Sequence, residues 1–159
     1  MRVGIISGYF NPIHTGHLDY IEGAKEKCDL LYVIVNSDQQ VNIKGSKQFM
    51  DEGSRLRIVR ALACVNKAMV SIDDDASVCR SIKSIHKQYC DDPFVSNIYF
   101  MNGGDRGQGT VPEAGICEEL DIKMIYNVGG IKTESSSTLL EKVADSALSE
   151  LILCLRRCM

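Results

Sequence analysis

Two histidines separated by a threonine and a glycine, His14 and His17, lie near the start of the chain in residues 8–17, GYFNPIHTGH. An apolar run precedes them, and residues with helical spacing follow. We expect a strand to end here and a helix to begin near Gly16. The first N–H groups of a helix have no intrahelical partner and carry the positive end of its dipole, so they attract anions. With imidazole donors beside them, this junction is typical of a phosphate site.

Other interpretations of the histidine pair stay open. Such pairs also occur in solvated loops and at helix caps. Structural zinc needs four ligands, usually including cysteines at short spacing, and the nearest cysteine here is Cys28. We therefore expect no metal held by protein ligands.

Length and composition indicate one globular domain over residues 1–159, with residues 139–159 as a C-terminal helix. The net charge of −3 disfavours nucleic acid as a partner. No segment has the length and apolarity of a membrane span, and no signal peptide is expected. The seven cysteines form no Cys-x-x-Cys pair, which indicates reduced, mostly buried thiols and a cytoplasmic location.

Short apolar segments alternate with segments of helical periodicity along the chain. The expected strands are residues 3–7, 30–36, 68–72, 97–101 and 123–128. This alternation predicts an α/β fold, a Rossmann-like three-layer sandwich whose five-stranded parallel sheet carries helices on both faces. Ligands of such sheets bind outside the carboxyl ends of the strands. The loops expected there are 8–17, 37–53, 73–75, 102–109 and 129–137.

Three of these loops carry further candidate residues. Residues 37–53 read as a long, flexible loop bearing Lys44, with Arg55 following near a helix start. Gly103 and Gly104 would let the backbone approach a ligand closely, and Asp105 could accept a hydrogen bond from a hydroxyl or base or help to hold a metal. Residues 129–138 combine Lys132 with a run of hydroxyl residues, which suits a second phosphate site. A solvated loop, a Gly-Asp turn and ordinary helix caps are the respective alternatives.

Taken together, these loops resemble the nucleotidyltransferase superfamily marked by His-x-Gly-His. The resemblance covers residues 3–143 and is nearest to its cytidylyltransferase-type branch, which includes glycerol-3-phosphate cytidylyltransferase and the heptose-1-phosphate adenylyltransferase domain. The residues on which the resemblance rests are 8–17, 35–38, Lys44-Gly45, Arg55, 103–105, and the segment from Lys132 to Thr138. Lys132 stands where the cytidylyltransferases have arginine, and Arg106 where they usually have an aromatic residue.

The resemblance implies an enzyme that transfers a nucleoside monophosphate, CMP in preference, from an NTP to a phosphorylated polyol, sugar or amino alcohol and releases pyrophosphate. It implies Mg²⁺ carried by the NTP phosphates and a homodimer. The catalytic residues implied are His14, His17 and Lys44. Substrate-binding residues would be Asn36, Asp38 and Arg106. Nucleotide-binding residues would be Gly8, Tyr9, Phe10, Gly16, Arg55, Gly104, Asp105, Lys132, Ser136, Ser137 and Thr138.

Three alternatives remain. One is an ATP-dependent adenylyltransferase acting on a sugar phosphate such as heptose 1-phosphate. The second is a nucleotide-binding regulator without catalysis, against which both histidines and Lys44 argue. The third is a fragment of an aminoacyl-tRNA synthetase, which the negative net charge disfavours.

Overall fold

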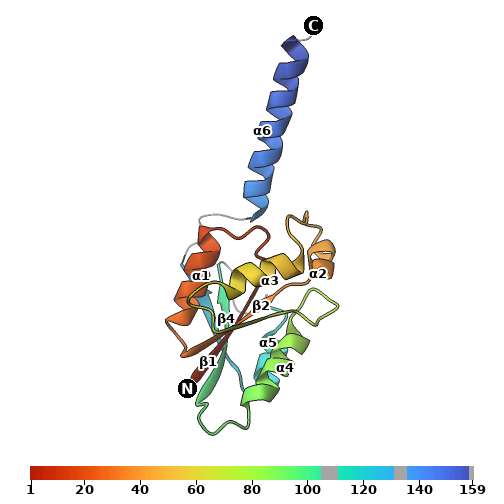
Figure 1. Ribbon diagram of the computed structural model, residues 1–159. Helices are drawn as coiled ribbons and strands as arrows, with labels where there is room; N and C mark the ends of the chain where they lie inside the picture. Colours follow the sequence, from red (N-terminus) through yellow and green to blue (C-terminus); the bar gives the residue numbers. More distant parts are fainter. Residues whose placement is uncertain (105–110, 131–135, 158–159) are drawn as a thin grey trace.

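The computed structural model describes residues 1–104, 111–130 and 136–157, and in the last range it describes the side chains of 138–148. Figure 1 shows the arrangement of the elements. The strands are β1 (Arg2–Gly8), β2 (Leu30–Val35), β3 (Lys67–Val70), β4 (Asn97–Gly103) and β5 (Lys123–Val128). The helices are α1 (Thr15–Lys25), α2 (Asp38–Ile43), α3 (Glu52–Arg60), α4 (Cys79–Tyr89), α5 (Ala114–Glu119) and α6 (Ser136–Arg157).

The five strands form one parallel sheet in the order β3-β2-β1-β4-β5. Ile5 of β1 lies between Tyr32 of β2 and Phe100 of β4. The chain leaves β1 for β2 on one side and reaches β4 on the other, so the strand order reverses at β1. Such a switch point opens a crevice at the carboxyl ends of the strands. The predicted five-stranded parallel sheet is confirmed.

Two buried cores, one on each face of the sheet, complete the predicted three-layer sandwich. Val3 and Ile5 of β1 pack with α4 and α5, whereas Ile6 packs on the other face with α1 and α3. Alternate residues of a strand point to opposite faces, so a strand buried on both faces is apolar nearly throughout. This explains why the strands read as continuous apolar runs.

Residues 37–53 are not the single flexible loop that we predicted. They contain α2, which is closed at its start by a capping box: the Ser37 hydroxyl accepts from the Gln40 N–H, and the Gln40 side chain accepts from the Ser37 N–H. Serine followed three residues later by glutamine is the sequence pattern of that box. Lys44 is therefore the C-cap of a short helix, which fixes the start of its side chain.

Tight contacts fix α1 against β4 and β5. The Tyr20 hydroxyl donates to the Met101 carbonyl at 2.6 Å, and a Cβ on Gly103 would lie 2.7 Å from the Tyr20 ring. Gly129 has φ +84°, and a Cβ there would lie 2.6 Å from the Tyr20 Cα. Both glycines permit a close approach that a larger residue would block. The first helix is thereby held over the carboxyl edge of β4.

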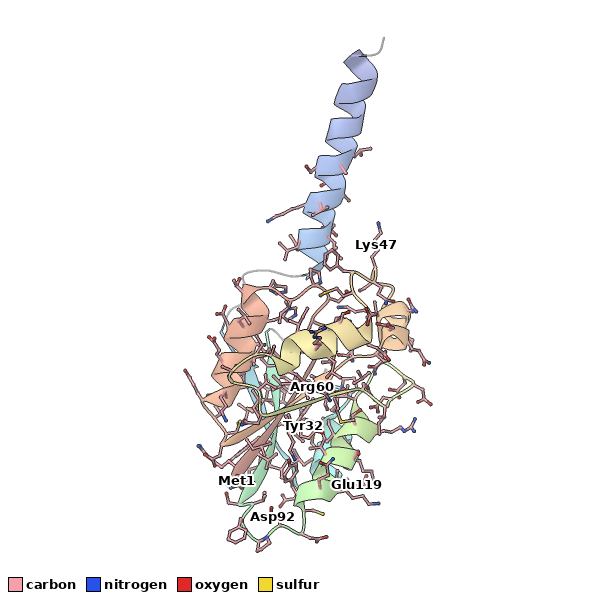
Figure 2. All side chains as sticks on the ribbon, viewed as in Figure 1. Met1, Tyr32, Lys47, Arg60, Asp92 and Glu119 are labelled. Atoms are coloured by element: carbon pink, nitrogen blue, oxygen red, sulfur yellow. The ribbon has the colours of Figure 1, made fainter. Side chains whose placement is uncertain are left out.

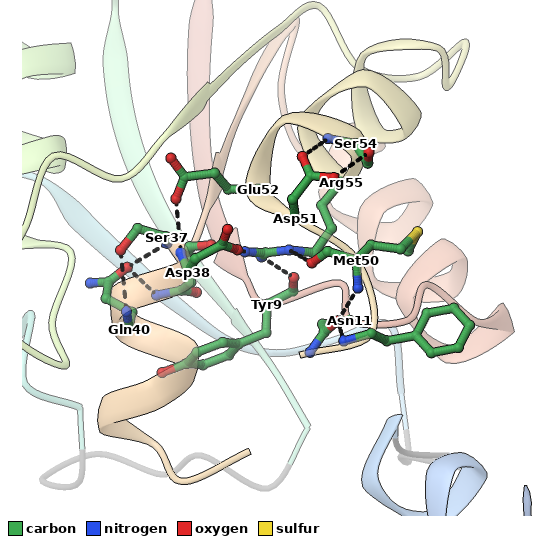
Figure 3. A network of polar contacts seen from close by, with 12 residues as sticks. Tyr9, Asn11, Ser37, Asp38, Gln40, Met50, Asp51, Glu52, Ser54 and Arg55 are labelled. Atoms are coloured by element: carbon green, nitrogen blue, oxygen red, sulfur yellow. Dashed lines mark hydrogen bonds and ion pairs between the residues drawn. The ribbon is translucent and has the colours of Figure 1, made fainter. Parts of the chain in front are cut away.

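The side chain of Arg55 joins the loops at the carboxyl edge from inside the protein. It has no exposed surface, and its guanidinium donates to the carbonyls of Tyr9 and Asn36 at 2.7 Å each and to that of Met50 at 3.2 Å. It also pairs with Asp38 at 2.7 Å. Figure 3 shows these contacts converging on one side chain. Arg55 therefore fastens the loop after β1 to the loops after β2 and before α3.

A buried amide extends this connection to the loop after β3. The Gln40 side chain accepts from the Asn36 Nδ2 at 3.0 Å and donates to the carbonyls of Asp75 and Ser77 at 2.8 and 2.6 Å. Gln40 is fully buried. Buried polar groups are tolerated when their hydrogen bonds are made, and here one amide links two loops.

The last helix, α6, extends away from the domain for its whole length in Figure 1. Its 22 residues include Val143 and Leu148, whose exposed fractions are 68% and 56%. Within residues 1–104, 111–130 and 136–157, no helix combines the length and apolarity needed to cross a membrane.

We predict that Arg55→Met lowers the free energy of unfolding by about 3–5 kcal/mol, because it leaves the buried carbonyls and Asp38 without their cationic donor. Urea unfolding followed by circular dichroism measures this loss. Arg57→Met is the matched control, since Arg57 is exposed on the same helix and should change stability by no more than about 0.5 kcal/mol. Equal stability of the two variants would contradict the role given to Arg55.

Candidate active site

The two histidines of the motif lie together at the start of α1. His14 is the N-cap, with an extended backbone (φ −148°, ψ 172°), and the His17 N–H donates to its carbonyl at 2.9 Å. The ring centroids are 3.8 Å apart, with 32° between the planes. Both side chains are half-buried. The helix begins at Thr15, one residue before the predicted position, and Gly16 lies in its first turn.

Phe10 packs its ring against His17 of this pair. Its side chain is 1% exposed, and its ring meets that of His17 edge-on at a centroid distance of 5.0 Å. Phe10 has φ +50°, and its ring lies so close to Gly8 that a Cβ there would be 2.7 Å away. Phe10 is among the residues predicted to bind nucleotide, and in the structure its side chain packs inside the protein. Glycine is needed at position 8 because a side chain there would collide with the Phe10 ring.

Asn11 fastens the motif to the segment before α3. Its Nδ2 donates to the Lys47 carbonyl at 2.8 Å, while its Oδ1 accepts from the N–H groups of Phe49 and Met50 at 2.8 and 3.1 Å. The side chain is only 4% exposed. Figure 3 shows this amide beside Met50, next to the contacts of Arg55. Sequence analysis missed this role, because the partners lie more than 35 residues away.

Lys44 provides a cationic group at the same edge of the sheet. Its side chain is exposed, and its Nζ lies 4.4 Å from the centroid of the Tyr9 ring. An ammonium over an aromatic face is stabilised electrostatically. The Arg55 contact to the Tyr9 carbonyl thus fixes the residue on which Lys44 rests. Figure 2 shows Lys47 on the following loop, at the end of the α/β domain that lies opposite Met1 and Asp92 and next to the start of α6.

Three residues that we predicted to contact ligands make hydrogen bonds within the protein. Arg55, expected at the nucleotide, has no exposed surface. Asp38, expected at the acceptor, is the ion-pair partner of Arg55. Asn36, also expected at the acceptor, is 5% exposed and donates to Gln40. The sequence shows these residue types at the edge of the sheet, and in the structure the contacts of their side chains are made within the protein.

The remaining predicted positions are described only in part. Gly104 has φ +67°, and the space where a Cβ would stand is open, which fits a turn close to a ligand. Thr138 is exposed in the first turn of α6. Asp105, Arg106 and Lys132 lie outside the described residues, and so do the side chains of Ser136 and Ser137.

Two buried polar residues at this edge were not singled out from the sequence. Glu113 caps α4 by accepting from the Val78 N–H at 3.0 Å, but its Oε2 has no hydrogen bond within the described part of the chain. The same holds for the Nδ2 of Asn102 at the end of β4. Each of these two atoms keeps capacity for at least one hydrogen bond. No short motif marks either residue, since their burial follows from packing.

Two of the described cysteines, Cys79 and Cys117, are poorly suited to act as nucleophiles. Burial raises the pKa of the Cys117 thiol to about 12 and also raises the pKa of Cys79. Thiols of high pKa stay protonated near neutrality and react poorly. The five described cysteines are free thiols, as expected. Only Cys28 and Cys117 among them are buried, whereas Cys64 and Cys79 are half-buried and Cys90 is exposed, so the expectation that most are buried was wrong for these five.

Two acidic residues in the loop after β3, Asp73 and Asp75, are held by hydrogen bonds. The Ser77 hydroxyl and N–H donate to Asp75 at 2.7 and 2.8 Å, which lowers the pKa of that carboxyl. Asp73 is buried and accepts from the Arg80 and Ser81 N–H groups at the start of α4. Both carboxyls therefore shape the loop after β3.

Comparison with known proteins agrees with this geometry. The HldE bifunctional protein of Streptomyces coelicolor is 30% identical over 142 residues, which cover 88% of this chain and 28% of that protein. The FAD synthase of Methanocorpusculum labreanum is 26% identical over 144 residues, covering 89% of this chain and 95% of that enzyme. The chain thus spans little more than a quarter of HldE and nearly all of that FAD synthase.

A solved structure shows the same fold. The lipopolysaccharide core biosynthesis protein of Thermoplasma volcanium superposes with a TM-score of 0.62 at 21% identity, covering 80% of this chain and 95% of that one. The family model described as "Cytidylyltransferase-like" matches residues 5–142, which include the second half of β1, the other four strands and the paired histidines. The chain therefore belongs to the cytidylyltransferase-like family of nucleotidyltransferases.

Proposed function

We propose that this protein transfers a nucleoside monophosphate from an NTP to a phosphorylated small molecule and releases pyrophosphate. The observation that carries the proposal is the pair of imidazoles, 3.8 Å apart at the N-terminus of α1. Helix N–H groups and imidazole donors suit a triphosphate, and Lys44 lies on the same edge of the sheet.

The proposed reaction is an in-line displacement at the α-phosphorus. A phosphate oxygen of the acceptor bonds to that phosphorus as its bond to the bridging oxygen breaks, and the bond electrons leave with pyrophosphate. His14 and His17 donate hydrogen bonds to the α- and β-phosphates as negative charge develops there. Lys44 moves from the Tyr9 ring to the phosphates. The rate comes from positioning and charge stabilisation, so no covalent intermediate on the protein is required.

Mg²⁺ is expected to accompany the triphosphate and to neutralise part of its charge. Among the described residues, no group of three or more His, Cys, Asp or Glu is placed to hold a metal ion. Phosphate oxygens and water would therefore supply most of its ligands, as is usual for Mg²⁺ with nucleotides.

Two donors are candidates. The segment from Lys132 to Thr138 resembles the cytidylyltransferase element, and it favours CTP with a polyol, sugar or amino-alcohol phosphate as acceptor. The FAD synthase relative, which matches over most of both chains, favours ATP. An ATP-dependent enzyme acting on a sugar phosphate is thus the second candidate. A nucleotide-binding regulator is the non-enzymatic one, and the geometry of His14, His17 and Lys44 argues for catalysis.

The direct test measures pyrophosphate release from each of the four NTPs with Mg²⁺ and a panel of phosphate monoesters, flavin mononucleotide included. We expect turnover with one NTP and one class of acceptor, with CTP as the preferred donor. A site that reads a base by buried hydrogen bonds rejects the wrong base strongly, because polar groups are then left unpaired. Turnover with ATP alone would identify ATP, and not CTP, as the nucleotide donor. Binding of an NTP without turnover on any acceptor would support the regulator.

His17→Ala should lower kcat by about 10²–10³-fold, as expected when a preorganised donor to the developing charge is lost. Thermal unfolding should change little, since the His17 side chain is only half-buried. His86→Ala on α4 is the control and should keep normal kcat. A His17→Ala enzyme with normal turnover would place this imidazole outside the reaction.

A further inference from the structure

Two buried side chains at the carboxyl edge of the sheet hold polar atoms that make no hydrogen bond in the described part of the chain. They are the Nδ2 of Asn102, near the end of β4, and the Oε2 of Glu113, the N-cap of α5. The side chains are 3% and 4% exposed. A buried donor or acceptor without a partner is costly, so these two atoms point to a ligand that is bound during function.

Both side chains lie on the face of the sheet that carries α4 and α5. Met101 packs on the other face, and a Cβ on Gly103 would meet a side chain of α1 there. Alternate residues of a strand point to opposite faces, so Asn102 points to the α4 face. Glu113 reaches the same face, because its other carboxylate oxygen accepts from the Val78 N–H directly before α4. The two atoms therefore lie across the sheet from the histidines of α1.

This side of the switch point suits the acceptor of the proposed transfer. In an in-line displacement the attacking oxygen and the departing pyrophosphate lie on opposite sides of the α-phosphorus. We have placed the pyrophosphate end of the NTP at the start of α1. The acceptor would then approach from the side on which α4 begins, where ligands of such sheets have access to the same crevice. This placement of the acceptor rests on the proposed function.

The two atoms together select one kind of chemical group. The amide Nδ2 of Asn102 can only donate a hydrogen bond, and a carboxylate oxygen of Glu113 can only accept one. A hydroxyl does both. An ammonium group would satisfy Glu113 but leave Asn102 unpaired, and a phosphate would be repelled by the carboxylate. The group that fits is a hydroxyl on the part of the acceptor away from its phosphate.

We propose that Asn102 and Glu113 bind a hydroxyl of the acceptor and thereby select polyol and sugar phosphates over amino-alcohol phosphates. The hydroxyl donates to the Glu113 Oε2 and accepts from the Asn102 Nδ2, while Glu113 keeps its contact with Val78 through Oε1. Neither atom is open to solvent in this structure, so the side chains have to shift when the acceptor binds. Such a shift breaks no hydrogen bond of Nδ2 or Oε2 among the described residues.

Isothermal titration calorimetry tests the proposal without any reaction. The protein is titrated with phosphate monoesters in the presence of Mg²⁺ and the α,β-methylene analogue of CTP or of ATP. Glycerol 3-phosphate, ribose 5-phosphate, mannose 1-phosphate and flavin mononucleotide carry hydroxyls, whereas ethanolamine phosphate and choline phosphate carry none. We expect binding of at least one compound of the first kind and of neither compound of the second. Pyrophosphate release from the unmodified NTPs is measured separately.

Exchange of the donor and the acceptor tests the two residues. Glu113→Gln keeps an oxygen for the Val78 N–H but turns the unpaired acceptor into a donor, and Asn102→Asp turns the donor into an acceptor. Each change should raise the Kd of the hydroxyl-bearing phosphate by about 10-fold or more. The double variant should recover most of this loss, because a hydroxyl can reverse its two hydrogen bonds. Glu118→Gln, at an exposed position on α5, is the matched control and should leave Kd unchanged.

Unchanged affinity in both single variants would overturn the proposal. Losses that the double variant does not recover would also overturn it, since the two residues would then only support the fold. The same holds if ethanolamine phosphate or choline phosphate binds, or if none of the monoesters binds. Binding with the expected pattern in the variants but without pyrophosphate release would support this hydroxyl site and contradict only the proposed transfer.

Discussion

The loops at the carboxyl edge of the sheet depend on one interaction, the buried guanidinium of Arg55 with its acceptors. A charged group without water around it is costly unless its hydrogen bonds are made. Here three carbonyls and one carboxylate accept from it, at distances of 2.7 to 3.2 Å. Those acceptors belong to separate loops, which are thereby held in one arrangement. The conformation of the motif loop is thus coupled to the packing of α3.

This coupling explains how a short motif is held in one conformation at the start of α1. Arg55 holds the carbonyl of Tyr9, Asn11 holds the segment before α3, and Phe10 packs beneath His17. Each contact removes freedom from the loop before any substrate arrives. Donors that are already in place need no reorganisation when charge develops on a phosphate, and this preorganisation is the main contribution of such a site to the rate.

The parts of the structure that follow from local pattern were predicted from the sequence. Apolar runs gave the five strands, and the motif gave the start of α1 next to the paired histidines. Roles that depend on distant partners were not predictable. From its place near a helix start Arg55 was expected at the nucleotide, and its burial against residues 17 to 46 positions away along the chain was not foreseen. The start of α2 did carry a local signal, the serine–glutamine capping box, which we overlooked in favour of loop length.

The central claim is that His14 and His17 meet the phosphates of an NTP, and the histidine signals in an NMR titration test it directly. The chain has three histidines, so His86 on α4 serves as an internal reference. With ¹⁵N-labelled imidazoles and Mg²⁺–NTP added in steps, the ring signals of His14 and His17 should shift together and saturate, while those of His86 stay in place. Unchanged His14 and His17 signals in the presence of bound nucleotide would contradict the account.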